Sequence, residues 1–383
     1  MKKSFDHWAL LICALVFSAA AFVVAYFRGI SPESLFIFGI LSGVIYSLTN
    51  VNDQRVMKGR LCLKEEKHLD NKDYITVAGS ITAVVTWFGL FIVYFVFKEL
   101  LSYGGYISDD LLEIFNSKMF IGFISIPFPF IFAGAFMVLN TWVYLEFIKR
   151  ETLRELGILV VLTIIIELLF GVFYFHDPVT FDETLLYIMA IFIIVIYLYH
   201  KGNTPKNSSR ADKKMLFLPL VFILSLFFVD FICRATMSPF GDDKKFFVSL
   251  IFRTLYLSMF LIYGAYWLIS DYKNKTKNKT AEEKKELRRK FKDSRGLICV
   301  TVITIMSSFF LKIPVIAYNF IAGPISYLIG NYVILQIIGF VYGTEGESEN
   351  VIGRLKEGFF GNKSLTFLSC VLVILLTSLL VIK

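Results

Sequence analysis

Three ionisable residues interrupt stretches of this sequence that are otherwise apolar. They are Glu167 in residues 156–175, Asp230 in residues 215–233 and Arg253 in residues 246–270. Each stretch is long enough to cross a hydrocarbon core of about 30 Å as an α-helix. A charge at such a depth costs at least a few kcal/mol unless it finds a partner. Residues of this kind therefore mark either an ion path or a structural pair inside a helix bundle.

Glu167 has the deepest position of the three. It lies about 16 Å from the start of its helix at 1.5 Å per residue, near the centre of a bilayer. Low dielectric disfavours the charged form of a carboxyl group, so we expect Glu167 to be neutral in at least one state. A neutral glutamic acid there either carries protons or hydrogen-bonds a neighbouring helix and holds the bundle together. The sequence leaves both roles open.

Asp230 and Arg253 lie on consecutive apolar segments that are joined by the short polar turn RATMSPFGDDKK. We expect Asp230 to pair either with Arg253 across this hairpin or with Arg234, one turn along its own helix. Such a pair is either a clamp that keeps two helices in register or part of a substrate or ion path. Asn140 is a further polar residue inside an apolar run, and it either lines the same path or ties two helices together.

The composition of the chain predicts that these residues lie on membrane-spanning helices. Of the 383 residues, 56% are hydrophobic and only 18% are charged, whereas charged residues approach a quarter of a soluble domain. The apolar runs that predict membrane helices are 8–27, 34–50, 75–97, 119–147, 156–175, 184–200, 215–233, 246–270, 296–316, 324–342 and 364–382. The sequence thus predicts an all-α polytopic transmembrane bundle of about eleven helices, a single membrane domain over residues 1–383.

Basic residues set the predicted orientation. When the helices alternate from a cytoplasmic N-terminus, most of the 39 Lys and Arg residues fall in loops on the inner side, above all in the loop 271–295. The positive-inside rule then places the N-terminus inside and the C-terminus outside, in a multi-pass protein of the cell membrane. These loops also account for the net charge of +8, so we do not expect nucleic acid as a partner.

The basic loop 271–295 predicts a partner at the cytoplasmic face. Its segment TAEEKKELRRKFK places Thr280 and Glu283 at the spacing of a capping box, so a helix should begin there. Basic residues close to a membrane surface attract anionic headgroups, at about 1 kcal/mol each. Anionic lipids are the predicted partner of the loop, and a soluble protein that docks on it is the alternative.

Motifs for catalysis and for cofactors are missing from the sequence. The five cysteines form no CxxC pair and the four histidines no HExxH motif, so neither a metal site nor a disulfide framework is predicted. There is no P-loop and no GxSxG motif, and the stretch NVNDQR holds one aspartate where a Mg-pyrophosphate clamp needs several. We therefore predict no cofactor, assign no catalytic residue and favour a protein that is not an enzyme.

Translocation is the function that these observations favour. The prediction is a secondary transporter or flippase-like permease whose path is lined by Glu167, Asp230, Arg253, Arg234 and Asn140. One alternative is a membrane-embedded enzyme on lipid-linked or glycan substrates, of the surface polysaccharide polymerase type. The other is a non-catalytic assembly or signalling subunit that uses the loop 271–295 to bind a soluble protein.

The predicted orientation is tested by thiol labelling in a background without the native cysteines. Asn274→Cys and Asn207→Cys should resist a membrane-impermeant reagent in intact cells, and Asp182→Cys should react, because the basic loops stay inside. Permeabilised cells are the control, in which all three variants should react. The opposite pattern in intact cells would reverse the orientation.

Overall fold

A computed structural model of the chain describes residues 32–57, 71–92, 128–150, 153–177, 213–240, 242–277 and 279–285, together with a few isolated positions. This part of the chain is helical apart from its turns, and it contains no β-strand. The predicted all-α class is confirmed for these residues. The predicted segments 8–27, 184–200, 296–316, 324–342 and 364–382 lie outside the described residues, apart from single positions in four of them.

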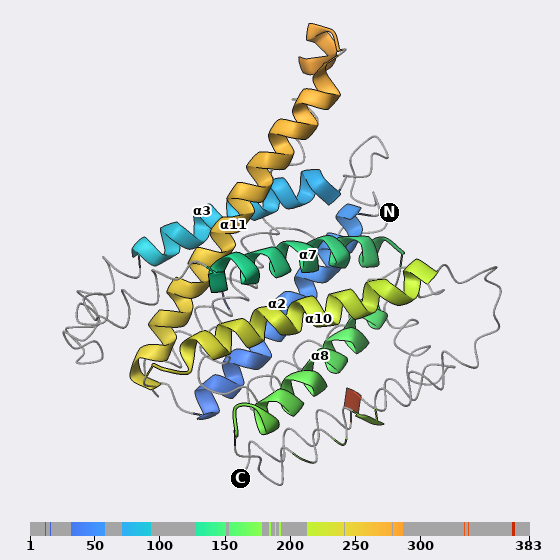
Figure 1. The fold of residues 1–383 in the computed structure, drawn as a ribbon. Helices are drawn as coiled ribbons and strands as arrows, with labels where there is room; N and C mark the ends of the chain where they lie inside the picture. Colours follow the sequence, from blue (N-terminus) through green and yellow to red (C-terminus); the bar gives the residue numbers. More distant parts are fainter. Residues whose placement is uncertain are drawn as a thin grey trace, which may run out of the picture.

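Six long helices make up the described structure (Figure 1), and each coincides with one of the predicted apolar segments. They are α2 (Pro32–Met57), α3 (Asn71–Ile92), α7 (Phe128–Arg150), α8 (Leu153–Phe173), α10 (Lys213–Met237) and α11 (Asp242–Thr276). The ends of α2 and α10 and the start of α3 reach beyond the apolar runs into polar sequence. These helices therefore carry polar side chains into the packed bundle at their ends.

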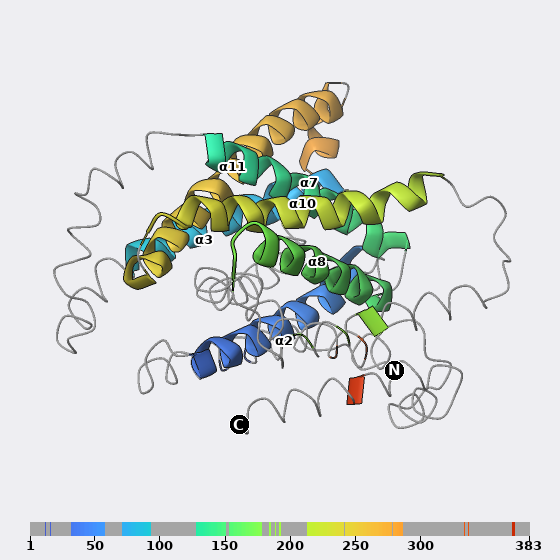
Figure 2. The same cartoon turned by 60° about the horizontal axis from the view of Figure 1, so that its bottom comes forward.

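The helix α7 occupies the centre of the bundle and contacts each of the other five helices. Figures 1 and 2 show that α10 and α11 meet at their shared turn and then diverge, with α7 beside both of them. The ring of Phe136 on α7 stacks on Phe228 of α10, and Phe130 on α7 packs against Phe252 of α11, with ring centroids 5.1 and 5.2 Å apart. The helix α3 packs along the other side of α11, and α8 along α10.

The bundle has two ends, which we name by the helices that meet there. At the α2–α3 end, on the right of Figure 1, α2 and α7 terminate and α3 begins; at the α10–α11 end, α8 and α10 terminate and α11 begins. Helices α7 and α10 run antiparallel, since Asn140 contacts Phe222 while Phe136, four residues earlier, contacts Phe228. We therefore describe the level of a residue along the bundle axis by the residue of α7 that lies beside it.

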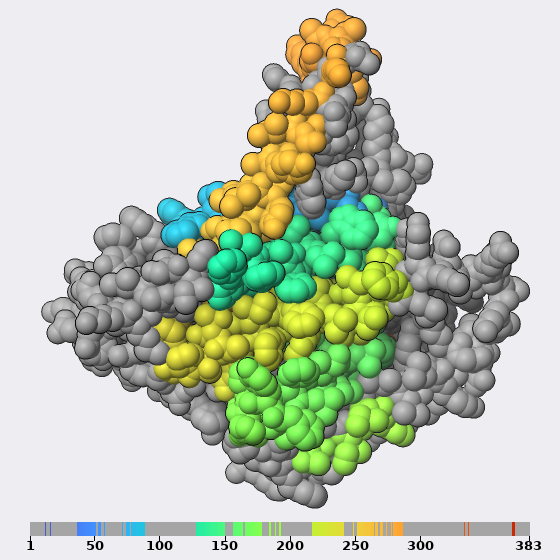
Figure 3. Space-filling view, in the orientation of Figure 1, coloured from blue at the N-terminus to red at the C-terminus, as the bar shows by residue number. Residues whose placement is uncertain are grey.

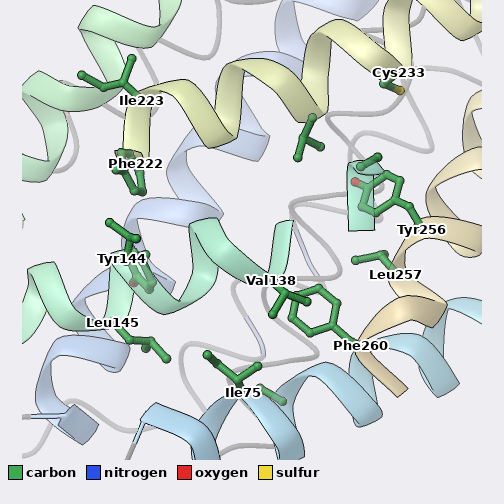
Figure 4. Packing of buried hydrophobic residues seen from close by; sticks show 14 of the residues in the cluster. Ile75, Val138, Tyr144, Leu145, Phe222, Ile223, Cys233, Tyr256, Leu257 and Phe260 are labelled. Carbon is green, nitrogen blue, oxygen red and sulfur yellow. The ribbon is translucent and has the colours of Figure 1, made fainter. Parts of the chain in front are cut away.

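Buried apolar side chains from four helices fill the space around α7. Figure 4 shows Val138 of α7 beside Phe260 of α11 and Ile75 of α3, and Tyr144 of α7 beside Phe222 of α10. The outward faces of α7, α8 and α10, which lie side by side in Figure 3, keep large apolar side chains exposed. A protein surface of this kind is typical of contact with lipid tails rather than with water.

Three of the described helices are long and apolar enough to cross a membrane. These segments are Phe128–Lys149, Leu156–Phe173 and Phe217–Met237. Shorter apolar segments occur in α2 (Ile37–Asn50), α3 (Tyr74–Phe88) and α11 (Ile251–Tyr263). Apolar helices of this length indicate a membrane-embedded protein.

Helix α11 continues past its apolar segment into the predicted basic loop 271–295. It continues as far as Thr276, because residues 271–276 contain no glycine or proline that would stop it earlier. The expected capping box follows: the backbone N–H of Thr280 donates to Glu283 Oε2 at 2.8 Å, and the N–H of Glu283 donates to Thr280 Oγ1 at 3.4 Å. The start of this loop is thus helical, and the capping box is confirmed.

Two glycines let helices approach α11 more closely than any other residue would. A Cβ atom at Gly134 of α7 would lie 2.8 Å from the carbonyl oxygen of Tyr256, and one at Gly79 of α3 would lie 2.8 Å from Cβ of Phe260. Both distances are shorter than real van der Waals contacts allow. The positions of α7 and α3 on α11 therefore depend on glycine.

Gly134→Ala should lower the thermal stability of the purified protein, even though alanine favours a helix over glycine by about 1 kcal/mol. Overpacking against the backbone of Tyr256 is expected to cost about 1–3 kcal/mol, because a carbonyl cannot be moved aside as a flexible side chain can. The measurement is thermal unfolding in detergent, with Leu139→Ala at an exposed site of the same helix as the control. A Gly134→Ala protein as stable as the wild type would contradict the close packing.

Candidate functional site

Asp230 of α10 forms an ion pair with Arg253 of α11. The distance between Arg253 Nη2 and Asp230 Oδ1 is 3.8 Å, and each side chain is 4% exposed. The pair lies near the turn at Ser238 and Phe240, where α10 and α11 are still close together. Of the two partners expected for Asp230, the one across the hairpin forms the described ion pair.

Arg234 forms a different ion pair, with Asp177 beyond the end of α8. Arg234 Nη2 lies 3.1 Å from Asp177 Oδ1, and the guanidinium carbon lies 5.6 Å from the centre of the Phe175 ring. Backbone bonds from Phe175 to Phe170 and from Asp177 to Gly171 close the end of α8. Sequence reasoning missed Asp177 because it follows the helix and its position depends on this local fold.

A left-handed residue shapes the same helix end. His176 has a φ of 55°, which is a positive value that is unusual for a residue other than glycine. L-residues other than glycine, asparagine and aspartate rarely adopt this conformation, which costs roughly 1–2 kcal/mol. The turn it produces brings Asp177 back toward α10, so the ion pair with Arg234 helps to offset the strain.

Asn140 ties α7 to α10. Its Nδ2 atom donates to the backbone oxygen of Phe222 and to Ser225 Oγ, both at 3.0 Å. Ser225 Oγ in turn donates to the Phe222 oxygen. These contacts fit the interhelical role that the sequence left open, and a place for Asn140 on a path stays a prediction.

Glu167 lies in α8 and is buried, with 5% of its surface exposed. One turn earlier, Thr163 is also buried, and its hydroxyl donates to the backbone oxygen of Leu159 at 3.0 Å. The inward position expected of a carboxyl group at this depth is therefore observed. Its predicted role on a path stays a prediction.

The structure also gathers a polar cluster at the α2–α3 end that sequence reasoning did not predict. Asp53 of α2 is 1% exposed and accepts hydrogen bonds from the hydroxyls of Tyr74 on α3 and Tyr144 on α7, the latter at 3.0 Å to Oδ2. The hydroxyl of Tyr144 also lies 2.8 Å from Oδ1 of Asn50, one turn before Asp53. We call Asn50, Asp53, Tyr74 and Tyr144 the Asp53 cluster.

The signal for this cluster was present in the stretch NVNDQR. Asn50, Asp53 and Gln54 lie at positions i, i+3 and i+4 on one face of α2, and all three are buried. Most of this stretch follows the predicted apolar run 34–50, but α2 continues to Met57, so these side chains turn into the bundle and not into solvent.

Burial changes the acid–base behaviour of Asp53, which lies beyond the apolar segment of α2. Desolvation raises the pKa of its carboxyl group to about 7, and the hydrogen bonds from Tyr74 and Tyr144 act in the opposite direction. Among the described residues, Asp53 has no lysine or arginine within ion-pair distance. The cluster therefore differs from the α10–α11 end, where Asp230 and Asp177 are each paired with an arginine.

A second amide lies at the same end of the bundle. Asn71, at the start of α3, donates from Nδ2 to Glu146 Oε2 of α7 at 3.1 Å. Its own Oδ1 atom is buried and accepts no hydrogen bond from the described residues, and the buried Nδ2 of Asn50 donates none to them. Asn71 lies one turn before Tyr74 on α3, so it belongs to the same end of the bundle as the Asp53 cluster.

Comparison with known proteins does not indicate a function, so a function has to be inferred from the geometry of the structure. No family model matches the chain, and neither a curated protein nor a solved structure matches it significantly. Within the described ranges, no group of three or more His, Cys, Asp and Glu side chains is placed to hold a metal ion. What the structure supplies is a membrane-type helix bundle with ion pairs near one end and a carboxyl–tyrosine cluster at the other.

The ion pair between Asp230 and Arg253 is tested by a double-mutant cycle. Asp230→Asn or Arg253→Gln alone should destabilise the protein by about 3–5 kcal/mol, because each change strands a buried charge. The charge swap should recover part of the loss, and stability is read from unfolding in detergent.

The control for this cycle combines Asp177→Asn with Arg253→Gln. These residues belong to different ion pairs, so their effects should add. Additive effects for Asp230→Asn and Arg253→Gln as well would show that these two side chains do not interact.

Proposed function

We propose that this chain is a multi-pass protein of the cell membrane, a translocator of the secondary transporter or flippase type. In this proposal it forms one domain of about eleven helices, with its N-terminus inside and its C-terminus outside. The polar path includes Glu167, Asp230 and Arg253, with Arg234 and Asn140 beside it.

One observation supports this proposal more than any other. Buried ionisable groups occur at two separate levels of the bundle, with Asp53 at the level of Tyr144 and Asp230 close to the level of Phe136. These two levels are about 12 Å apart along α7 at 1.5 Å per residue. Glu167 adds a further buried carboxyl on α8. A bundle that needed only stability would gain little from such groups, because burying them costs free energy.

The structure also favours a second function, binding at the cytoplasmic face. Helix α11 has 35 residues, about 52 Å at 1.5 Å per residue, against about 30 Å for a hydrocarbon core. Figures 1 and 3 show its far end projecting from the bundle, followed by the short helix that Thr280 caps. We propose that this basic projection binds anionic lipid headgroups, with a soluble protein as the alternative partner.

The translocator proposal is tested with Glu167→Gln in liposomes. Glutamine keeps the size and the hydrogen-bonding ability of the side chain but holds no exchangeable acid proton. Wild type and variant are reconstituted at the same protein density. Two signals are then measured: proton entry, with a pH dye inside the liposomes, and the movement of a fluorescent phospholipid between the two leaflets.

We expect the wild type to move at least one probe faster than empty liposomes, and Glu167→Gln to lose most of that activity while it stays folded. Leu169→Ala, an exposed position two residues away, is the matched control and should behave as the wild type. A Gln variant with unaltered activity and an unaltered pH profile would refute the role of Glu167. The binding function of the projection would then be favoured.

A further inference from the structure

The hydroxyl of Tyr144 has one proton and two acceptors. It lies 2.8 Å from Asn50 Oδ1 and 3.0 Å from Asp53 Oδ2, and a hydroxyl donates to only one of them at a time. The hydroxyl of Tyr74 is used on Asp53 Oδ1. Three acceptor oxygens therefore share two donors, and the cluster lacks one proton.

A proton on Asp53 Oδ2 completes the hydrogen bonds of the cluster. Asp53 then donates to the oxygen of Tyr144, Tyr144 donates to Asn50 Oδ1, and Tyr74 still donates to Asp53 Oδ1. Each of these oxygens has a partner in this arrangement. The buried group is also neutral, which removes the main cost of placing a carboxyl group where it is only 1% exposed.

The reverse orientation of the Asn50 amide does not remove the need for a proton. With its nitrogen toward Tyr144, both tyrosine hydroxyls would serve an ionised Asp53, and Asn50 Oδ1 would lose its partner. The cluster would then hold a buried negative charge with no cation among the described side chains in reach. Hydrogen bonds from two neutral hydroxyls do not replace the hydration of a carboxylate.

From this geometry we infer that the Asp53 cluster is a proton-binding site: Asp53 takes one proton from water at the α2–α3 end and holds it against Tyr144. The inference does not depend on the proposed translocation, because the site exists whether or not a substrate moves. The proton joins α2 to α7, and through Tyr74 to α3. Loss of the proton leaves a charged carboxylate among these helices and favours an arrangement that lets water reach it.

Among the described side chains, the titratable groups that face Asp53 are phenols and not cations. Tyr46 lies on the same helix, Tyr74 comes from α3 and Tyr144 from α7. A metal ion needs several free oxygen lone pairs, whereas Asp53 Oδ1 already accepts from the Tyr74 hydroxyl and Asn50 Oδ1 from the Tyr144 hydroxyl. A proton fits this set of groups better than a cation does.

Infrared difference spectroscopy of purified full-length protein is the direct test. We expect the stretching band of a protonated carboxyl group in the wild type at neutral pH, lost as the pH is raised. Asp53→Asn should remove this band, and Asp177→Asn, whose carboxylate is paired with Arg234, should leave it in place. Tyr74→Phe should shift the loss of the band by about one unit to higher pH, since a donor to the ionised form is gone.

A second measurement covers the case in which a variant folds poorly. Because Asp53 has a higher proton affinity in the folded state than in the unfolded state, the wild type should lose stability as the pH rises from about 4 to 7. Asp53→Asn should show a weaker loss over the same range. Thermal unfolding against pH gives both curves, with Glu282→Gln on the exposed short helix as the control.

Two results would overturn the inference. A wild-type protein without the protonated band at neutral pH, whose aspartate signals titrate only in the usual acid range, would show that Asp53 is ionised. A signal of Asp53 that changes at constant pH when sodium is replaced by N-methylglucamine would show that the site takes a monovalent cation instead.

Discussion

The arrangement of this bundle depends on buried polar side chains that find a partner on another helix. Helix α7 supplies three of these side chains, and it is the element that the other five long helices contact. Its Asn140 binds α10, Tyr144 binds α2 and Glu146 accepts from α3. In an apolar setting, where van der Waals contacts discriminate little between alternative packings, such bonds give each helix a definite position along its neighbour. The glycine contacts on α11 add a steric limit to the same positions.

The two ends of the bundle meet this need by different chemistry. Near the α10–α11 end, Asp230 and Asp177 each have an arginine, and arginine stays charged at all physiological pH values. At the α2–α3 end, Asp53 has only tyrosine hydroxyls and an amide nearby. The first end therefore balances its buried carboxylates with fixed positive charges, whereas the second uses neutral hydrogen-bond donors.

Sequence patterns predicted the elements of this fold better than its contacts. The apolar runs located all six described helices, and the charges at Asp230 and Arg253 predicted a pair because the turn between them is short. The Asp53 cluster was missed because its members come from three helices far apart in the chain. The stretch NVNDQR has the residues of a polar loop, and only the continuation of α2 buries it. The close approach at Gly134 likewise depends on which helix faces it, which one sequence does not reveal.

Helix α11 runs unbroken from the ion pair near its start to a tip outside the bundle. A continuous helix acts as a rigid lever over a distance of this order. With about 52 Å between its ends, a tilt of about 5° at the turn would displace the tip by roughly 4–5 Å. Arg253 lies about 17 Å from the start of the helix, and the glycine contacts of α7 and α3 follow at Tyr256 and Phe260. A small tilt at the turn between α10 and α11 is therefore amplified at the basic tip.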